Sequence, residues 1–163
     1  MKYIKLFATG GTFDKEFNEI NGELFFKKTN LYELLDLGRC KLDIKIETLM
    51  MIDSLKMSET ERNYIVSKCK KEETHKIIIT HGTDTIVETA KILAESINDK
   101  TIILTGAMIP IKFGSSDGLF NLGSALSFVQ TLDPGVYITM NGRYFHWDNV
   151  KKNKKIGAFE KVR

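Results

Sequence analysis

Three consecutive isoleucines, Ile77, Ile78 and Ile79, constrain the fold of this chain more than any other feature. Successive side chains of a strand point to opposite faces of its sheet, so a strand that is apolar at every position must be covered on both faces. Strands of this kind are typical of mainly parallel sheets, whose crossover helices pack on the two faces. The run therefore predicts a buried central strand in an α/β protein.

The other segments alternate between strand and helix patterns in the order that such a sheet requires. Ser58 and Glu61 form a capping box, and Asn30 and Asp117 are expected to cap two further helices. This rhythm indicates right-handed βαβ crossovers and a Rossmann-like, mainly parallel sheet with helices on both faces. We predict strands over residues 3–8, 42–48, 77–79, 101–104 and 136–140, and helices over residues 30–37, 58–70, 85–96 and 117–131.

Two further segments predict hairpins. Asn141-Gly142 follows the last predicted strand and is a strong signal of a tight hairpin turn. Residues 13–29 contain Asn21-Gly22 and fit neither period, so they are expected to form a long loop or a flap-like hairpin near the N-terminus. Loops of that length are uncommon unless they are functional. The 163 residues suffice for one core but are few for two, so residues 1–163 are predicted to form a single domain.

Charge and composition argue against several classes of function. The 24 Lys and Arg against 21 Asp and Glu residues give a net charge of +3, which is too small to indicate a nucleic-acid or membrane partner by itself. No apolar run approaches the ~20 residues of a membrane span, and no signal peptide is recognised. Cys40 and Cys69 are isolated, so we expect two packing residues in a cytoplasmic protein. The basic run at 151–155 is expected to be a solvated face; nucleic-acid binding through it, with an affinity that falls steeply with salt, is the weaker alternative.

Small polar residues follow three of the predicted strands. The first strand continues into Thr9-Gly10-Gly11-Thr12, the isoleucine run into Thr80-His81-Gly82-Thr83-Asp84-Thr85, and the next strand into Thr105-Gly106-Ala107. In a parallel sheet these turns meet at the carboxyl edge, where ligands of open α/β sheets bind. Glycine lets the backbone approach a ligand closely, and threonine adds hydroxyls that can donate, accept or attack. Turn chemistry explains any one motif equally well, but three that converge indicate a site.

The residue types at this edge narrow the chemistry. Neither a nucleotide-binding glycine motif nor the G-x-S-x-G motif of serine hydrolases is present. His75, His81 and His146 are scattered, so no metal site is expected, and His81 is expected to fix its own turn. What remains is a threonine hydroxyl that a base must activate, with a carboxylate and lysines nearby. A neutral lysine positioned by Thr83 and Asp84 could serve as that base, an arrangement that suits acyl transfer from a small amide.

These motifs resemble the bacterial-type L-asparaginase/glutaminase family. The resemblance covers nearly the whole chain in family order, at residues 8–12, 53–57, 80–85, 105–110, 117–122 and 150–153. It implies that Thr12 is the nucleophile and that Thr83, Asp84 and Lys152 form the set that activates it. The neighbouring Lys151 remains the alternative lysine.

The resemblance also implies how a substrate is held. Asp84 and Thr83 would bind the substrate, with the Asp84 carboxylate on its α-ammonium group. Ser54 would bind its α-carboxylate, helped by the backbone N–H groups of Gly11 and Gly82. The implied reaction is hydrolysis of L-asparagine to L-aspartate and ammonia, with weaker activity on L-glutamine and with no cofactor or metal.

This chain departs from the family in two ways. Family members are usually about twice as long, with a second domain that completes a neighbouring subunit's site, so this chain resembles the short single-domain members. The family's flap also carries a tyrosine that helps to position the nucleophile, and Phe17 stands in that region here. A phenyl ring lacks the hydroxyl, so a catalytically weak or inactive amino-acid-binding domain is the alternative function.

The shared site of the family predicts a homo-oligomer, either a dimer or a dimer of dimers. Aromatic residues outside the predicted strands are expected to anchor its interface, or alternatively to pack in the core. They are Phe113, Phe120, Tyr144, Phe145 and Trp147.

Overall fold

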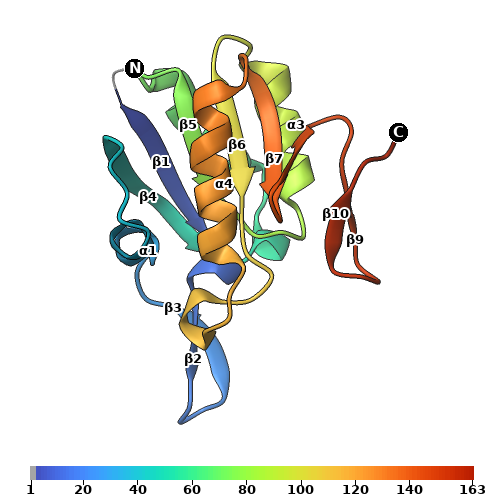
Figure 1. Ribbon diagram of the computed structural model, residues 1–163. Helices are drawn as coiled ribbons and strands as arrows, with labels where there is room; N and C mark the ends of the chain where they lie inside the picture. Colours follow the sequence, from blue (N-terminus) through green and yellow to red (C-terminus); the bar gives the residue numbers. More distant parts are fainter. Residues whose placement is uncertain (1–2) are drawn as a thin grey trace.

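A six-stranded sheet forms the centre of the computed structural model, which describes residues 3–163 (Figure 1). In chain order its strands are β1 (Ile4–Gly10), β4 (Ile44–Ile52), β5 (Lys76–Thr80), β6 (Thr101–Thr105), β7 (Gly135–Met140) and β8 (Arg143–His146). The spatial order is β4-β1-β5-β6-β7-β8, and all neighbours are parallel except β7 and β8. The prediction of a mainly parallel α/β sheet is confirmed.

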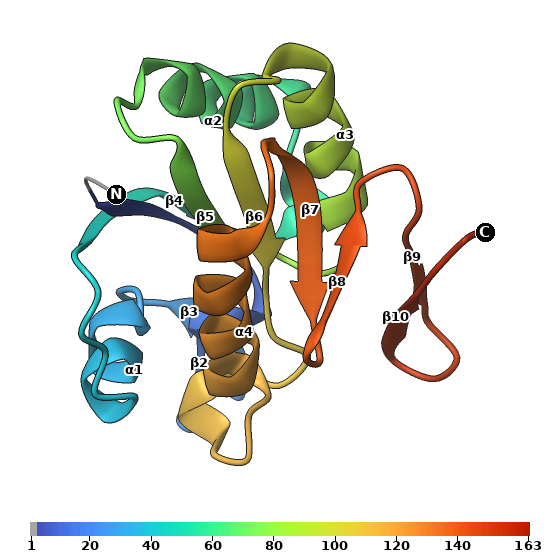
Figure 2. The ribbon, with the colours of Figure 1, turned by 45° about the horizontal axis from the view of Figure 1, so that its top comes forward.

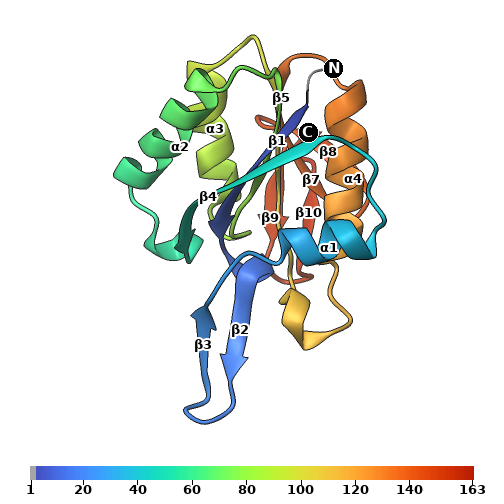
Figure 3. The same cartoon turned by 90° about the vertical axis from the view of Figure 1, so that its left-hand side faces the viewer.

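Helices cover both faces of this sheet (Figure 3). One face carries α2 (Glu59–Lys71) and α3 (Ile86–Ser96), and the other carries α1 (Leu31–Leu37) and α4 (Gly118–Thr131). Ile77 and Ile79 pack in the core beneath α2 and α3, whereas Ile78 packs in the core beneath α1 and α4. All three side chains are fully buried, as a strand apolar on both faces requires.

Both predicted hairpins are present. Asn141 and Gly142 connect β7 to β8 with φ angles of 55° and 78°, as a turn with two left-handed residues requires. The flap is an antiparallel hairpin of β2 (Lys15–Asn18) and β3 (Glu23–Phe26), and it projects beyond the sheet (Figure 1). Short 3₁₀ turns complete the structure: η1 (Thr12–Asp14), η2 (Ser54–Lys56) and η3 (Ile111–Phe113).

A small ribbon near the C-terminus was not predicted. It consists of β9 (Lys151–Asn153) and β10 (Ala158–Glu160), which pair only with each other and lie beside the main sheet (Figure 2). Strands of three residues are too short for an alternating pattern to be recognised. Lys154 and Lys155 are exposed, as expected of a solvated face, but Lys152 is not.

The strand β4 starts two residues later and ends four residues later than its alternation predicts. It spans Ile44–Ile52 instead of residues 42–48 and pairs with β1 as far as Gly10 and Ile52. Its last four residues are apolar without a polar alternation, so the sequence pattern hides them. Asp43 stays outside the strand, although its carbonyl accepts a hydrogen bond from the Ile4 N–H at 2.9 Å.

The predicted N-cap positions of Asn30 and Asp117 and the capping box at the start of α2 are confirmed. Asn30 and Asp117 occupy the N-cap positions of α1 and α4, but their side chains make no capping hydrogen bond. The Asn30 amide donates to the Phe13 carbonyl, and the Asp117 carboxylate accepts the N–H of Met108. Each side chain instead forms a hydrogen bond with the backbone of a loop that is distant in sequence. A local capping pattern cannot reveal such a partner.

The late aromatic residues divide between core and surface. Phe145 is buried and Trp147 packs against the core, so neither is an exposed interface anchor. Phe113, Phe120 and Tyr144 are 52%, 63% and 47% exposed. These three remain open to a partner.

Both cysteines are free thiols, as expected of packing residues. Cys69 is fully buried, and its burial raises the pKa of the thiol to about 12, so it stays protonated at neutral pH. Within residues 3–163, no helix is both long and apolar enough to cross a membrane.

Candidate active site

Two glycines bring the turns after β1 and β5 into direct contact. Gly11 has a φ of 72°, in the left-handed region that favours glycine. A Cβ atom on Gly11 would lie 2.4 Å from Gly82 N, and one on Gly82 would lie 2.5 Å from Ser54 Oγ. No side chain fits at either position unless the neighbouring turn moves. Gly11, Ser54 and Gly82, expected together from the sequence, are therefore adjacent.

The backbone N–H of Gly11 has a structural partner. It donates to the Ile52 carbonyl at 2.9 Å and so joins β1 to β4. This corrects the expectation that it binds a substrate carboxylate. The N–H of Gly82 makes no hydrogen bond with the residues that the structure describes, which leaves it as the backbone donor of the pair.

Thr12 and Thr83 directly follow the two touching glycines. Thr12 is half-buried at the start of η1, and its hydroxyl makes no hydrogen bond within the described part of the chain. Thr83 is 5% exposed. The Thr12 hydroxyl is thus unengaged, whereas the Thr83 hydroxyl accepts a hydrogen bond from Lys152. The two threonines lie on neighbouring turns at the carboxyl edge of the sheet.

The ribbon strand β9 returns Lys152 to the start of α3. Its Nζ donates to Thr83 Oγ1 at 2.8 Å and to Asp84 Oδ1 at 2.7 Å. The Lys152 side chain is 12% exposed and that of Asp84 is 35% exposed, so the pair lies at the rim of the site. Lys151 instead forms an ion pair with Glu160 at 3.3 Å. The structure brings Lys152, and not Lys151, to the Thr83-Asp84 turn, and the expectation of a solvated face is wrong for Lys152.

His81 holds the backbone of the turn that carries these groups. It is fully buried, with Nδ1 2.8 Å from the Gly82 carbonyl and Nε2 2.8 Å from Thr89 Oγ1. Burial lowers the pKa of His81 to about 4, so the ring is neutral at pH 7. Its Nδ1–H donates to Gly82 and its Nε2 accepts from Thr89, which confirms that His81 fixes its own turn. Among residues 3–163, no group of three His, Cys, Asp or Glu is placed to hold a metal ion.

Two other strand-end threonines have structural partners. Thr9 donates to the Thr80 carbonyl at 2.7 Å, and Thr105 donates to the Thr139 carbonyl at 2.8 Å. Both are fully buried. They join the carboxyl ends of neighbouring strands, so their hydroxyls are not available to a ligand.

An ion pair joins the flap to the turn that carries Ser54. Lys15, the first residue of β2, donates to Asp53 Oδ2 at 2.6 Å, and Asp53 Oδ1 accepts the Leu55 N–H at 3.0 Å. The Lys15 ammonium lowers the pKa of the Asp53 carboxyl. The two residues are 38 positions apart, so the sequence pattern did not indicate this contact.

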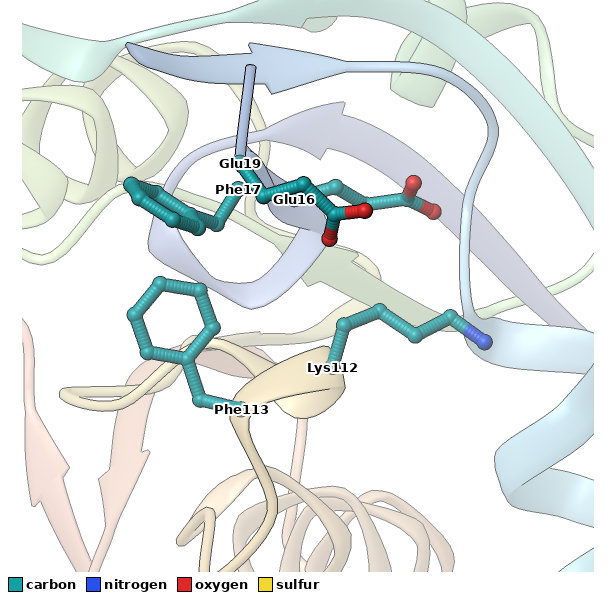
Figure 4. A pocket seen from close by; sticks show the side chains of 5 residues that line it. All are labelled: Glu16, Phe17, Glu19, Lys112 and Phe113. Carbon is teal, nitrogen blue, oxygen red and sulfur yellow. The ribbon is translucent and has the colours of Figure 1, made fainter. Parts of the chain in front are cut away.

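The flap residue Phe17 packs against the loop after β6. Its ring meets that of Phe113 edge to face, with the ring centres 6.3 Å apart (Figure 4). The two rings border a surface hollow of about 500 Å³ that Glu16, Glu19 and Lys112 also line. None of the proposed catalytic residues lines it, so this hollow is separate from the lysine and threonine cluster.

Asp14 clasps the two ends of the flap. Its Oδ1 accepts the Asn30 N–H at 2.8 Å and the Thr29 hydroxyl at 3.2 Å. The side chain is fully buried, and Oδ2 has no partner among the described residues. Burial raises the pKa of Asp14 to about 6. The clasp lies two residues after Thr12, and sequence reasoning missed it because an acidic residue beside a flap is ordinarily solvated.

Asp14→Asn should change how stability depends on pH. The carboxyl pKa rises from 3.8 in the unfolded chain to about 6 in the folded one, so the folded state binds more protons between these values. Ionisation of Asp14 then costs stability as pH rises, by about 3 kcal/mol in all. We expect the variant to gain about that much relative to the parent between pH 4 and pH 7, measured by urea unfolding. A difference that stays constant with pH would show that Asp14 is not a strained buried acid.

Comparisons with known proteins show which family this chain resembles. The family profile described as "Asparaginase, N-terminal" matches residues 3–162. An L-asparaginase of Thermococcus kodakarensis is 30% identical over 171 residues, covering 99% of this chain and 51% of that protein. A glutaminase-asparaginase of Acinetobacter glutaminasificans is 38% identical over 91 residues, covering 53% of this chain and 28% of that one.

Solved structures show the same similarity. The thermostable L-asparaginase from Thermococcus kodakarensis superposes with a TM-score of 0.82 at 28% identity, over 98% of this chain and 51% of that one. A probable cytoplasmic L-asparaginase from Campylobacter jejuni gives 0.83 at 29% identity, over 98% and 52%. The chain thus spans about half the length of these relatives. Because the profile matches almost every residue, the chain belongs to the asparaginase family and corresponds to its N-terminal domain.

Proposed function

We propose that this chain is an amidohydrolase that converts L-asparagine to L-aspartate and ammonia, with weaker activity on L-glutamine, and that residues 1–163 act as one domain. The observation that carries the proposal is the pair of hydrogen bonds from Lys152 to Thr83 and Asp84, at 2.8 and 2.7 Å. These groups lie beside the contact between Gly11 and Gly82. The names of the relatives, L-asparaginase and glutaminase-asparaginase, support both substrates.

In the proposed reaction, Thr12 Oγ1 attacks the carbonyl carbon of the substrate's side-chain amide. A hydroxyl is a weak nucleophile until a base removes its proton. We assign that role to the Lys152 amine, acting through the Thr83 hydroxyl. The proton then passes to the leaving nitrogen, which departs as ammonia and leaves an ester on Thr12. Water hydrolyses this ester, which releases L-aspartate and restores the hydroxyl.

The other groups of the site hold the ends of the amino acid. Asp84 is accessible enough to bind the α-ammonium group, since its side chain is 35% exposed. Ser54 and the Gly82 N–H, on opposite sides of one tight contact, would bind the α-carboxylate. Gly11 contributes the close approach between the turns instead of a donor.

The direct test is ammonia release from the purified protein. We expect release from L-asparagine, matched one to one by L-aspartate, and slower release from L-glutamine, each measured at low and high amide concentration. Binding of L-aspartate without turnover would leave only an amino-acid-binding domain. Absence of both would overturn the proposal. Greater turnover by Phe17→Tyr would show that the flap limits the rate.

We also propose that the chain forms a homodimer or a dimer of dimers that covers the active-site edge. Large apolar side chains are exposed on the flap and on the loop facing it: Phe17 is 52%, Ile20 is 93% and Phe113 is 52% exposed. Light scattering during chromatography should give at least twice the 18.6 kDa mass of one chain. A single-chain mass together with full turnover would contradict the shared site.

A further inference from the structure

Arg62 is a buried cation on α2 whose partners all lie near the proposed site. The residue is 6% exposed. Its Nη1 donates to the Met57 carbonyl at 2.6 Å, its Nη2 to Thr85 Oγ1 at 2.9 Å and its Nε to Thr89 Oγ1 at 3.2 Å. The planar guanidinium thus donates from all three of its nitrogens, which a lysine cannot reproduce.

These acceptors belong to two different segments. Met57 ends the η2 turn that begins at Ser54, and its N–H donates to the Ser54 carbonyl at 3.2 Å. Thr85 and Thr89 belong to the start of α3, directly after Asp84. The Thr85 hydroxyl also donates to the Ser54 carbonyl at 2.9 Å. Arg62 therefore connects the Ser54 turn to the start of the helix that follows Asp84, the other substrate-binding group.

A second set of hydrogen bonds connects Arg62 to Gly82 through His81. The Thr89 hydroxyl that accepts from Arg62 lies 2.8 Å from His81 Nε2, and His81 Nδ1 lies 2.8 Å from the Gly82 carbonyl. Gly82 in turn packs directly on Ser54. The contacts form a closed ring through Arg62, Thr89, His81, Gly82, Ser54 and Met57.

Stability alone does not explain a buried arginine at this position. Its ionic partner is Glu88, 3.2 Å away, whose side chain is 65% exposed, and exposed ion pairs contribute little. Burying a charge is costly, and an apolar side chain of similar volume often serves stability as well or better. The feature that an apolar residue would lack is the set of directed bonds to both segments.

We infer that Arg62 is a positioning residue that sets the distance between Ser54 and the Thr83-Asp84 turn. This rests on the proposed function, in which the two segments hold the α-carboxylate and α-ammonium groups of one amino acid. The hydrogen bonds of Arg62 all go to protein groups, so we assign it no contact with either end of the substrate. Its loss should therefore weaken substrate binding more than it slows the chemical step.

The test compares Arg62→Met with Lys100→Met. Lys100 is a matched control because it is 5% exposed and donates to the Glu72 and Thr74 carbonyls at 2.6 and 3.3 Å, just before β6 and so at the opposite edge of the sheet. We expect Arg62→Met to raise KM for L-asparagine about tenfold or more, with kcat within about threefold. Lys100→Met should leave KM within about twofold while lowering Tm comparably. A KM change no larger in Arg62→Met than in Lys100→Met would overturn the inference.

Two further measurements keep the outcome decisive. Arg62→Lys retains the charge and stem, so it tests the same direction of KM change if Arg62→Met does not fold. Hydrogen exchange without ligand should be about tenfold faster at residues 53–57 and 82–85 in the Arg62 variants and unchanged there in Lys100→Met. If the parent protein neither turns over nor binds an amino acid, the proposed function fails. Hydrogen exchange still tests whether Arg62 holds the two segments together. Unchanged exchange at both segments would refute the positioning role of Arg62.

Discussion

Thr12→Ala should lower kcat for ammonia release by about 10³-fold or more, because the alanine variant has no oxygen to form the acyl intermediate. The fold should be unaffected. Thr12 is half-buried and its hydroxyl makes no hydrogen bond with the described residues, so the change in unfolding free energy should stay within about 1 kcal/mol. Initial rates at saturating L-asparagine, together with a thermal melt, measure both effects.

Thr12→Ser is the matched control because it keeps the hydroxyl and removes only a methyl group. It should retain far more activity than the alanine variant. A loss below about tenfold in Thr12→Ala would place the nucleophile elsewhere, with Thr83 as the next candidate because its hydroxyl contacts Lys152.

Lys152→Met should lower kcat by about 10²-fold to 10⁴-fold, the range that a positioned acid or base contributes. Its Nζ is the group that contacts both Thr83 Oγ1 and Asp84 Oδ1 in this turn. Removal of the amine leaves the threonine set without its base, while Asp84 remains partly hydrated at 35% exposure. Stopped assays over long times are needed because the residual rate will be low.

The neighbouring lysine supplies an internal control. Lys151 pairs with Glu160 at 3.3 Å, with side chains 58% and 35% exposed, and such a pair contributes little to stability. Lys151→Met should leave kcat within about twofold. If both variants lost activity equally, the effect would come from the charge of the ribbon and not from a base at position 152.

Local sequence patterns were sufficient to predict the layers of this protein, a sheet with helices on both faces. The isoleucine run predicts a strand covered on both faces because side-chain direction alternates with a period of two. Asn141-Gly142 predicts the β7–β8 turn because both residues tolerate positive φ. The strand-end motifs also predict a common edge, since parallel strands end on the same side of a sheet. Each of these inferences needs only neighbouring residues and the geometry of one element.

Contacts between distant segments were decided only by the tertiary structure. Lys152 and Thr83 are 69 positions apart in the chain. The sequence does not distinguish Lys152 from its neighbour Lys151, and only the three-residue strand β9 orients the two side chains differently. Asp14 and Arg62 are charged residues with no special sequence pattern, yet both are buried, because segments elsewhere in the chain supply their hydrogen-bond partners. The sequence by itself determined the sheet, its covering helices and the edge where the site lies, because local periodicity and chain direction specify them. Which charged groups meet at that edge depends on long-range packing, and no local period encodes it.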